Sequence, residues 1–396
     1  MNEINNPNFK DKKFLIGHIK SIMGFYHPHC IDNETGGFFQ HFKDDGSIYD
    51  LETRHLVSST RFIFNYSMAA MQFNNVEYID AAKHGIDYLR EHHLNKDTGG
   101  YAWMMNGKEV TDSTNYCYGL AFVLLAYSTA YKAGIKEAKN YIEETFDLME
   151  KYFWSKEHEL YSDEINSDWS IVTNYRGQNA NMHTCEALIQ AFESTNEQKY
   201  LDRALLIAKN ICIRQAGLAD GLIWEHYDIN WQIDWSYNKD TPDDLFRPWG
   251  FQVGHLTEWS KLLIILERHS KEDWLLSRAQ ELFDDAIEMG WDEKSGGLFY
   301  GVAPNGDVCD NDKYFWVQAE SLAAAAVLAH RTGDEYYWDW YEGIWEYSWK
   351  HMVDHKYGAW FRILDSKNMK YDNLKSPAGK VDYHTMGACY EVLNLG

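Results

Sequence analysis

The stretch WDEKSGGLFYG at residues 291–301 joins an acidic turn, small residues and an aromatic pair, and five related segments lie elsewhere in the chain. They are IDNETGGFFQ (31–40), NKDTGGYAW (95–103), SKEHELYSDE (155–164), LADGLIWEHYD (218–228) and DHKYGAWFR (354–362). Counted from Gly36, Gly99, Leu160, Gly221, Gly296 and Tyr357, the spacings are 63, 61, 61, 75 and 61 residues. Self-similarity at a nearly fixed period indicates a repeat architecture.

Between successive segments, the apolar residues follow helical spacing. Residues 113–134 are apolar on nearly every side, as in a buried helix, whereas 135–154 carries its charges on one face. The alternation predicts further buried helices near 54–72, 179–195, 248–268, 313–332 and 381–393, and amphipathic helices near 8–26, 75–93, 196–215, 271–289 and 334–352. Six buried helices inside six half-exposed ones predict an all-α fold, an (α/α)6 barrel.

The repeats run from end to end, so we expect residues 1–396 to form a single catalytic domain, although length alone would suggest two or three. Each repeated segment is predicted to be a long connection, with short β-hairpins, from an outer helix into the next inner one. The return connections, such as 132–134 and 331–333, are short. The long loops and the inner-helix N-termini should therefore lie at one end of the barrel, where function is expected.

The amino-acid composition limits the kinds of molecule that the protein is expected to bind. A net charge of −23 lacks the basic footprint of a nucleic-acid binder and suits a protein that handles a small neutral ligand. The N-terminal MNEINNPNFKDKK has no apolar signal region, and SLAAAAVLAH is too short to span a membrane. The six cysteines are scattered, as in a reducing cytoplasm. We expect a cytoplasmic protein without a nucleic-acid or membrane partner; a homo-oligomer stays open.

Polar residues near the predicted inner-helix starts are candidates for the site. They are Arg54, His55, Arg61, Asn115, Tyr116, Arg176, Asn179, His183, Glu186, Arg247, Gln252, His255, Glu258, Trp316, Gln318, Glu320, Asp382 and His384. Three histidines on three inner helices are the central observation. A single buried histidine is usually a core residue satisfied by a neighbour, but three at one level, each with carboxylates nearby, indicate a functional site.

Two H-x-x-E pairs, His183 with Glu186 and His255 with Glu258, lie on single helix faces. Such pairs could hold a divalent metal. We favour the alternative that each glutamate orients an imidazole or binds a substrate hydroxyl, because no H-E-x-x-H or clustered Cys/His motif accompanies them. Neither a metal nor another cofactor is therefore predicted. Aromatic residues at the loop end, Trp316 among them, would suit the apolar faces of a sugar ring.

Five segments resemble, in order, the inner-helix signatures of the N-acylglucosamine 2-epimerase superfamily, and the resemblance covers nearly the whole chain. They are RHLVSSTRFIFNYS (54–67), NANMHTCEAL (179–188), RPWGFQVGHLTEWSKLL (247–263), YFWVQAESLAA (314–324) and DYHTMGACYE (382–391). Within the superfamily, RHLVSSTRF most resembles the D-mannose isomerase and aldose–ketose isomerase branch.

The resemblance implies an (α/α)6 barrel and a metal-independent reaction on a monosaccharide through a cis-enediol. It implies that His384 moves the proton at sugar C2, that His255 is the second acid/base, and that His183 serves ring opening and substrate binding. Substrate contacts are implied for Arg54, Tyr116, Asn179, Glu258 and Trp316. The implied activity is the interconversion of D-mannose and D-fructose, with lyxose and xylulose as a further pair.

Other functions stay open at this point. Arg54 and the positive ends of the inner helices would stabilise the developing oxyanion. The same two histidines, His255 and His384, would also serve a 2-epimerase of the N-acetylglucosamine or cellobiose type. An inverting glycoside hydrolase needs two carboxyl groups about 6.5–9.5 Å apart. A non-catalytic sugar-binding protein and a metal-dependent hydride-shift isomerase are further alternatives.

Overall fold

The computed structural model describes residues 7–395, and twelve α-helices lie in that range, in the order that the repeats predict. The inner helices are α2 (Leu56–Phe73), α4 (Cys117–Lys132), α6 (Gln178–Thr195), α8 (Val253–His269), α10 (Phe315–Thr332) and α12 (Tyr383–Leu393). The outer helices are α1 (Lys12–Tyr26), α3 (Val76–Tyr88), α5 (Ala138–Tyr152), α7 (Gln198–Lys209), α9 (Trp274–Gly290) and α11 (Glu335–His351).

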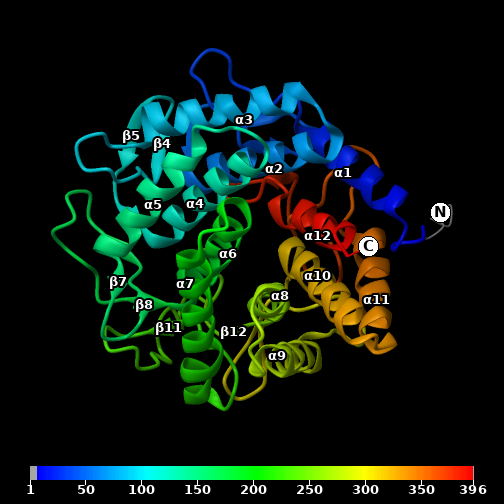
Figure 1. Cartoon of the computed structure of the whole chain (residues 1–396). Helices are drawn as coiled ribbons and strands as arrows, with labels where there is room; N and C mark the ends of the chain where they lie inside the picture. The colour runs from blue at the N-terminus through cyan, green and yellow to red at the C-terminus, as the bar shows by residue number, and fades with distance from the viewer. Residues whose placement is uncertain (1–6, 396) are drawn as a thin grey trace.

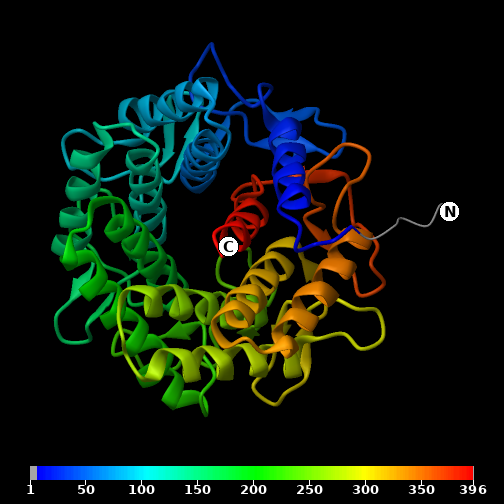
Figure 2. The same cartoon turned by 45° about the vertical axis from the view of Figure 1, so that its right-hand side comes forward.

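The helices follow one another around a ring in chain order, so that α12 comes to lie beside α1 and α2 (Figures 1 and 2). Each inner helix packs against the inner helices on either side and against an outer helix. Buried apolar side chains from Phe9 to Val392 form one continuous cluster. The prediction of an (α/α)6 barrel is confirmed.

Short strands occupy the long connections, and those that precede inner helices account for the later starts of these helices. They are β1 (His41–Lys43), β2 (Ile48–Asp50), β3 (Thr53–His55), β4 (Met104–Asn106), β5 (Glu109–Asp112), β6 (Asn115–Tyr116), β7 (Trp154–Ser155), β8 (Leu160–Tyr161), β9 (Glu164–Ile165), β10 (Arg176–Gly177), β11 (His226–Tyr227), β12 (Phe251–Gln252), β13 (Gly301–Val302), β14 (Val308–Asp310), β15 (Lys313–Tyr314), β16 (Ile363–Leu364) and β17 (Leu374–Ser376). The helices α4 and α8 begin four and five residues later than predicted, at Cys117 and Val253, because β6 and β12 occupy the preceding residues.

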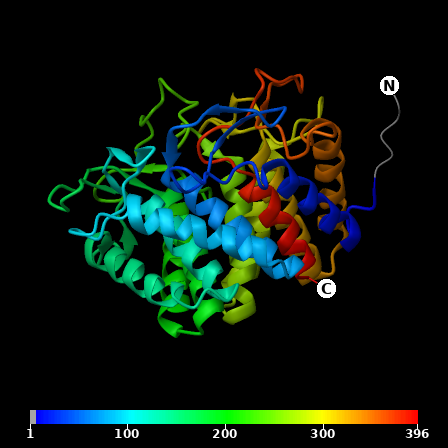
Figure 3. The ribbon, with the colours of Figure 1, turned by 90° about the horizontal axis from the view of Figure 1, so that it is seen from above.

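Strand pairing closes the ring. The strand that leads into each inner helix pairs antiparallel with a strand of the next repeat: β3 with β4, β6 with β9, β10 with β11, β12 with β13, and β15 with β16. The sixth such pair joins β17, before α12, to β1, before α2. The long connections gather at one end of the barrel (Figure 3). The predicted grouping of loops and inner-helix N-termini at that end is confirmed.

The repeated turn has a physical cause. In three repeats, an aspartate accepts backbone N–H groups two and three residues ahead: Asp32, Asp292 and Asp354 each do so through Oδ1. The following Gly37 and Gly297 have φ of +70° and +80°, and a Cβ at either would collide with a tyrosine ring of an outer helix. Glycine is required there by both its left-handed backbone and the close approach.

None of the helices within residues 7–395 combines the length and the apolar character that crossing a bilayer demands.

Candidate active site

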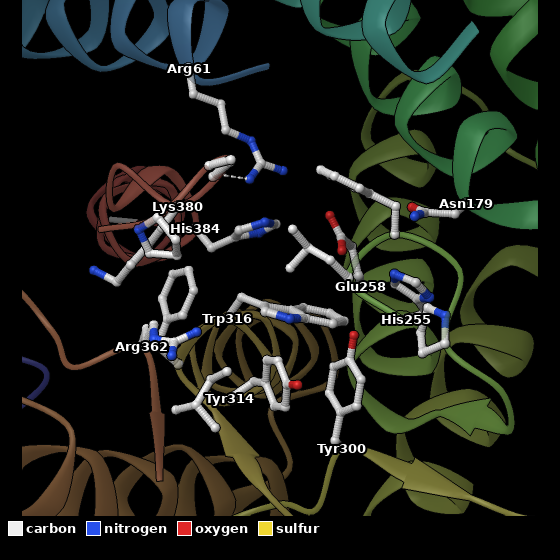
Figure 4. Close-up of a pocket in the computed structure, with 18 of the residues that line it drawn as sticks. Arg61, Asn179, His255, Glu258, Tyr300, Tyr314, Trp316, Arg362, Lys380 and His384 are labelled. Atoms are coloured by element: carbon white, nitrogen blue, oxygen red, sulfur yellow. Dashed lines mark hydrogen bonds between the residues drawn. The ribbon is translucent and has the colours of Figure 1, made fainter. Parts of the chain in front are cut away.

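A cavity of about 760 Å³ opens at the loop end of the barrel, and side chains from all six inner helices line it (Figure 4). They are Arg61 from α2, Tyr118 from α4, Asn179 and His183 from α6, His255 and Glu258 from α8, Trp316 from α10 and His384 from α12. The predicted residues His183, His255, His384, Asn179, Glu258 and Trp316 thus meet in one cavity.

His384 is held by a carboxylate on the neighbouring helix. Its Nδ1 donates to Glu320 Oε1 at 2.6 Å, which leaves Nε2 as the ring nitrogen available to the cavity. Burial, with the positive charge of Arg61 next in importance, lowers the pKa of His384 well below its ordinary value. The ring is therefore neutral near pH 7 and can accept a proton.

His255 is held in a similar way. Its Nδ1 lies 2.9 Å from Glu225 Oε1 and 3.0 Å from Gln178 Nε2. Glu225 belongs to the fourth repeated segment, just ahead of β11, and Gln178 begins α6. Since Glu225 accepts the Nδ1 proton, Nε2 of His255 also stays available for a ligand.

His183 completes the set. Its Nδ1 lies 2.9 Å from Glu186 Oε2 on the same helix, and burial lowers the pKa of the imidazole. Its ring centroid lies 6.3 Å from that of His384. Three imidazoles thus share one arrangement, with Nδ1 bound to a carboxylate.

Trp316 joins the two predicted acid/base residues. Its ring centroid lies 5.0 Å from that of His255 and 5.8 Å from that of His384 (Figure 4). Tyr300 and Tyr314, whose rings stack at 3.8 Å, continue this aromatic wall. An apolar wall flanked by imidazoles suits the ring or chain of a sugar.

Several buried polar atoms of the cavity have no hydrogen-bond partner within the described chain. They are Oε1 and Oε2 of Glu258, Oδ1 of Asn179 and Nε of Arg61. Burial, followed by the charge of Glu320, raises the pKa of Glu258 well above its ordinary value, which favours the protonated form of this carboxyl. Unpaired buried polar groups are costly, and they cluster where a polyhydroxylated ligand would supply the missing partners.

Arg54, for which a substrate contact is expected, is not among the residues that line the cavity. Its Nη2 donates to Asp32 Oδ2 at 2.8 Å and its Nη1 donates to Leu51 O, with the side chain fully buried. Lys313 pairs with Asp292 at 2.7 Å and Lys375 with Asp354 at 2.6 Å in the same manner. Arg54 is therefore one of three buried cations that tie a repeated turn to the strand before an inner helix.

Arg61 lies in the cavity instead. It is one of the residues picked out near the start of this inner helix, and it donates to Gly379 O and, at 3.3 Å, to Tyr118 Oη. Its guanidinium lies over the rings of Phe122 and Tyr383, and no carboxylate pairs with it within residues 7–395. A buried cation without a counter-ion is well placed to meet a developing negative charge.

Tyr116 also lies outside this cavity. Its ring packs on Trp103 at 4.4 Å, and it lines a neighbouring hollow of about 740 Å³. Tyr118, two residues further on, lines both spaces. The chain passes from β6 into α4 here, so that a small difference in position decides which hollow a side chain faces.

Some contributors were not assigned to the site by sequence reasoning. Glu225 lies within a repeated segment and Tyr300 within the stretch quoted first, yet nothing in the local pattern marks Tyr300 as a cavity residue or Glu225 as the partner of His255. Arg362 and Lys380 line the mouth, where Asp372 and Asp382 pair with them. The acidic residue that recurs in each repeated segment is the one feature of the sequence that could have pointed to Glu225.

Two sets of side chains in the described chain bring potential metal ligands within 4.8 Å of one another. They are His183 with Glu186 and Glu258, and Glu258 with Glu320 and His384. The ammonium of Lys261 reaches the same carboxylates: it pairs with Glu320 and lies 3.9 Å from an oxygen of Glu186 and of Glu258. The chain itself thus supplies a cation at this position.

Known proteins resemble the chain over nearly its full length. A protein named D-mannose isomerase, from Marinomonas mediterranea, is 61% identical over 388 residues, covering 98% of both chains. A crystal structure of a D-mannose isomerase superposes with a TM-score of 0.97 at 60% identity and covers 98% of this chain and 99% of the other. A cellobiose 2-epimerase from Bacillus thermoamylovorans shares the fold, with a TM-score of 0.85 at 19% identity over 97% of this chain and all of the other.

The sequence pattern of the N-acylglucosamine 2-epimerase (GlcNAc 2-epimerase) family matches residues 37–388, a range that includes all six inner helices except the end of the last. The chain belongs to the N-acylglucosamine 2-epimerase family, as its inner-helix segments predict.

Proposed function

We propose that the chain is an aldose–ketose isomerase that interconverts D-mannose and D-fructose by moving a proton between C2 and C1 of the open-chain sugar. Two findings support this proposal: the likeness to D-mannose isomerases over the whole chain, and the three carboxylate-held imidazoles around one cavity. The second finding carries the chemistry, because proton transfer next to a carbonyl needs a positioned base that is unprotonated at neutral pH.

His384 is the proposed base. Its neutral ring takes the proton from C2 through Nε2, and the carboxylate of Glu320 stabilises the imidazolium that forms. The electrons left behind make the C1–C2 double bond of a cis-enediolate with its negative charge on O1, and a proton shift from O2 to O1 moves this charge to O2. Return of the proton to C1 gives the ketose, whereas return to C2 regenerates the aldose.

Arg61 and Glu258 are proposed to bind the oxygens whose charge changes. The guanidinium of Arg61 stabilises the oxyanion at O1 or O2, in the role first expected of Arg54. The carboxyl group of Glu258 forms a hydrogen bond with a sugar oxygen, which satisfies its buried oxygens that lack a partner. His183 and Asn179 hold the remaining hydroxyls, with His183 assisting ring opening.

A 2-epimerase is the second candidate, and His255 is the observation that favours it. This imidazole faces the same cavity from the other side of Trp316. If His255 returned a proton to the opposite face of C2, the product would be the epimer of the starting aldose.

A glycoside hydrolase is less well supported. An inverting enzyme needs two carboxyl groups flanking the bond. Glu258 is the one carboxyl among the described residues that line the cavity, while Glu320 is bound to Lys261 and Asp382 to Tyr26 and Lys380.

We also infer metal-independent turnover and a cytoplasmic location. The cation at the potential metal ligands belongs to Lys261, and all six cysteines of the described chain are unpaired. Lyxose and xylulose are the expected further substrate pair.

The test is incubation with D-mannose in D2O, with and without a chelator, followed by NMR. We expect fructose as the first product, with deuterium at C1, at equal rates in both samples. Glucose appearing before fructose would assign the chain as an epimerase. Transfer without any deuterium, together with inhibition by the chelator, would indicate a metal-dependent hydride shift instead.

A further inference from the structure

Beneath the three imidazoles lies a buried charged layer that the proposed reaction does not use directly. The carboxyl groups of Glu186 on α6, Glu258 on α8 and Glu320 on α10 converge on the ammonium of Lys261. Lys261 is 6% exposed and Glu320 is 2% exposed, so this ion pair is largely shielded from bulk water. A lysine is almost never buried to this degree without partners, which makes its placement here specific.

The layer separates two cavities. The sugar-sized cavity lies on its loop side, and a second hollow of about 710 Å³ lies on the other side, bordered by Lys261, Glu186, Glu320 and Tyr383. His384 borders both. The layer thus lies between the imidazoles and the second hollow.

Each contact in the layer leads to an imidazole. Glu320 binds Lys261 with one oxygen and His384 Nδ1 with the other. Glu186 accepts from Tyr383 Oη at 2.7 Å through the oxygen nearest Lys261, while its other oxygen binds His183 Nδ1. One ammonium therefore stands behind the carboxylates of two different histidines.

The charges agree with this arrangement. Burial opposes a positive charge on Lys261, but the acidic groups around it, Glu320 first, outweigh burial and raise the pKa of the ammonium. Burial likewise opposes ionisation of Glu186, yet the hydrogen bond from His183 and the charge of Lys261 lower its pKa to about 2. Without the ammonium, ionised carboxylates would face one another in a buried site at high cost.

We propose that Lys261 is a positioning residue of the reaction: its ammonium replaces a metal ion as the cation that holds Glu320 and Glu186, and through them His384 and His183, in place beneath the sugar. The inference rests on the proposed proton transfer. It extends that function by assigning the cationic role to a residue that does not line the substrate cavity.

The first test compares Lys261→Met with Lys132→Met, a control lysine that borders the lower cavity and pairs with Glu193 at the barrel's other end. We expect Lys261→Met to lower kcat about 10- to 100-fold, the scale on which partners of functional imidazoles act, with KM within about threefold of wild type. The control should retain wild-type kcat. Equal kcat values in the two variants would overturn the proposal.

The pH profile separates positioning from a merely structural role. The charged and titratable groups that face His384 are Arg61 on α2, His183 and Glu186 on α6, Glu258 and Lys261 on α8, and Glu320 on α10. Removing the Lys261 charge raises the tendency of His384 to bind a proton, so the acidic limb of kcat/KM should move up by about one pH unit.

Glu320→Gln serves if Lys261→Met does not fold. It removes the negative charge next to His384 and leaves the ammonium, so the same limb should move down in pH. An upward shift of the acidic limb in Lys261→Met and a downward shift in Glu320→Gln support the proposal. If Lys261→Met does not fold, the downward shift in Glu320→Gln supports it alone. An unchanged limb in a folded variant would contradict it.

Rescue provides the third arm. In Lys261→Ala, ethylammonium should raise kcat saturably, because the lower cavity adjoins the vacated position, whereas tetramethylammonium at equal ionic strength should not. If ethylammonium did not raise kcat and the acidic limb of kcat/KM did not shift, Lys261 would have only a structural role. Wild-type protein that produced no fructose from mannose would overturn the proposed substrate, whereas deuterium exchange into any aldose would still report on Lys261.

Discussion

At the scale of single residues, the orientation of each imidazole decides the chemistry more than its presence does. Glu320 and Glu225 bind Nδ1 of His384 and His255, and this selects the tautomer with Nε2 free. Burial keeps the ring of His384 neutral, and the adjacent carboxylate stabilises the charge when the ring accepts a proton. The ring can therefore act as a base that returns its proton.

Replacing His384 by Asn should lower kcat/KM for mannose by about 10²- to 10⁴-fold, the usual contribution of a positioned acid/base group. His269→Asn is a suitable control, since His269 pairs with Glu193 at the opposite end of the barrel. Steady-state kinetics and circular dichroism on both variants measure the effect and the integrity of the fold. A His384→Asn variant with near-normal turnover would remove this residue from the mechanism.

The pH dependence follows from the same residue. His384 acts only when neutral and its pKa is lowered, so activity should be lost as the pH falls through a value below 6.5. Arg61→Met removes one of the charges that lower this pKa, and the acidic limb should then move up by about one pH unit. A kcat/KM profile from pH 4 to 8 checks both points; a limb that stays in place in Arg61→Met would show that this charge does not act on the base.

At the scale of the elements, the strands before the inner helices hold the active end together. Arg54 in β3 and Lys313 in β15 each stand two residues ahead of an inner helix and each bind the aspartate of a repeated turn. These ion pairs are buried, so that the loss of one partner leaves an uncompensated charge.

Arg54→Met and Lys313→Met should therefore have similar effects: each should lower the free energy of unfolding by about 3–5 kcal/mol. Urea unfolding measures this loss. Because Arg54 does not line the cavity, KM for mannose should stay within about twofold of wild type below the unfolding transition. A large rise in KM without a loss of stability would restore Arg54 as a substrate contact.

At the scale of the whole molecule, closure of the ring makes the two ends of the chain interdependent. The strand β17 pairs with β1, and α12 packs on α1 and α2. His384 on α12 and Arg61 on α2 meet in the cavity only because the ring closes.

Hydrogen exchange should reveal this interdependence. The slowest amides of α2 and α12 should open with free energies within about 1 kcal/mol of each other, as parts of one cooperative unit. A much lower opening free energy for the amides of α12 than for those of α2 would indicate that the ring closure is weak.

Much of this protein could be predicted before any coordinates. The 61-residue spacing and the apolar periodicity located all twelve helices, because helix formation depends on neighbours three and four positions away. The histidines at the inner-helix starts followed from the same register. The family was recognisable because its signatures lie within single helices.

The contacts between helices could not be predicted in this way. Arg54 and Arg61 lie seven positions apart, but Arg54 falls in β3 and meets Asp32, whereas Arg61 falls in α2 and faces the cavity. Likewise Glu320 and Lys261 reach their partners from other repeats, and Glu225 reaches His255 from 30 residues away. Local spacing specifies which face of a helix is buried, but only close packing around the closed ring specifies which side chain from a distant repeat it meets.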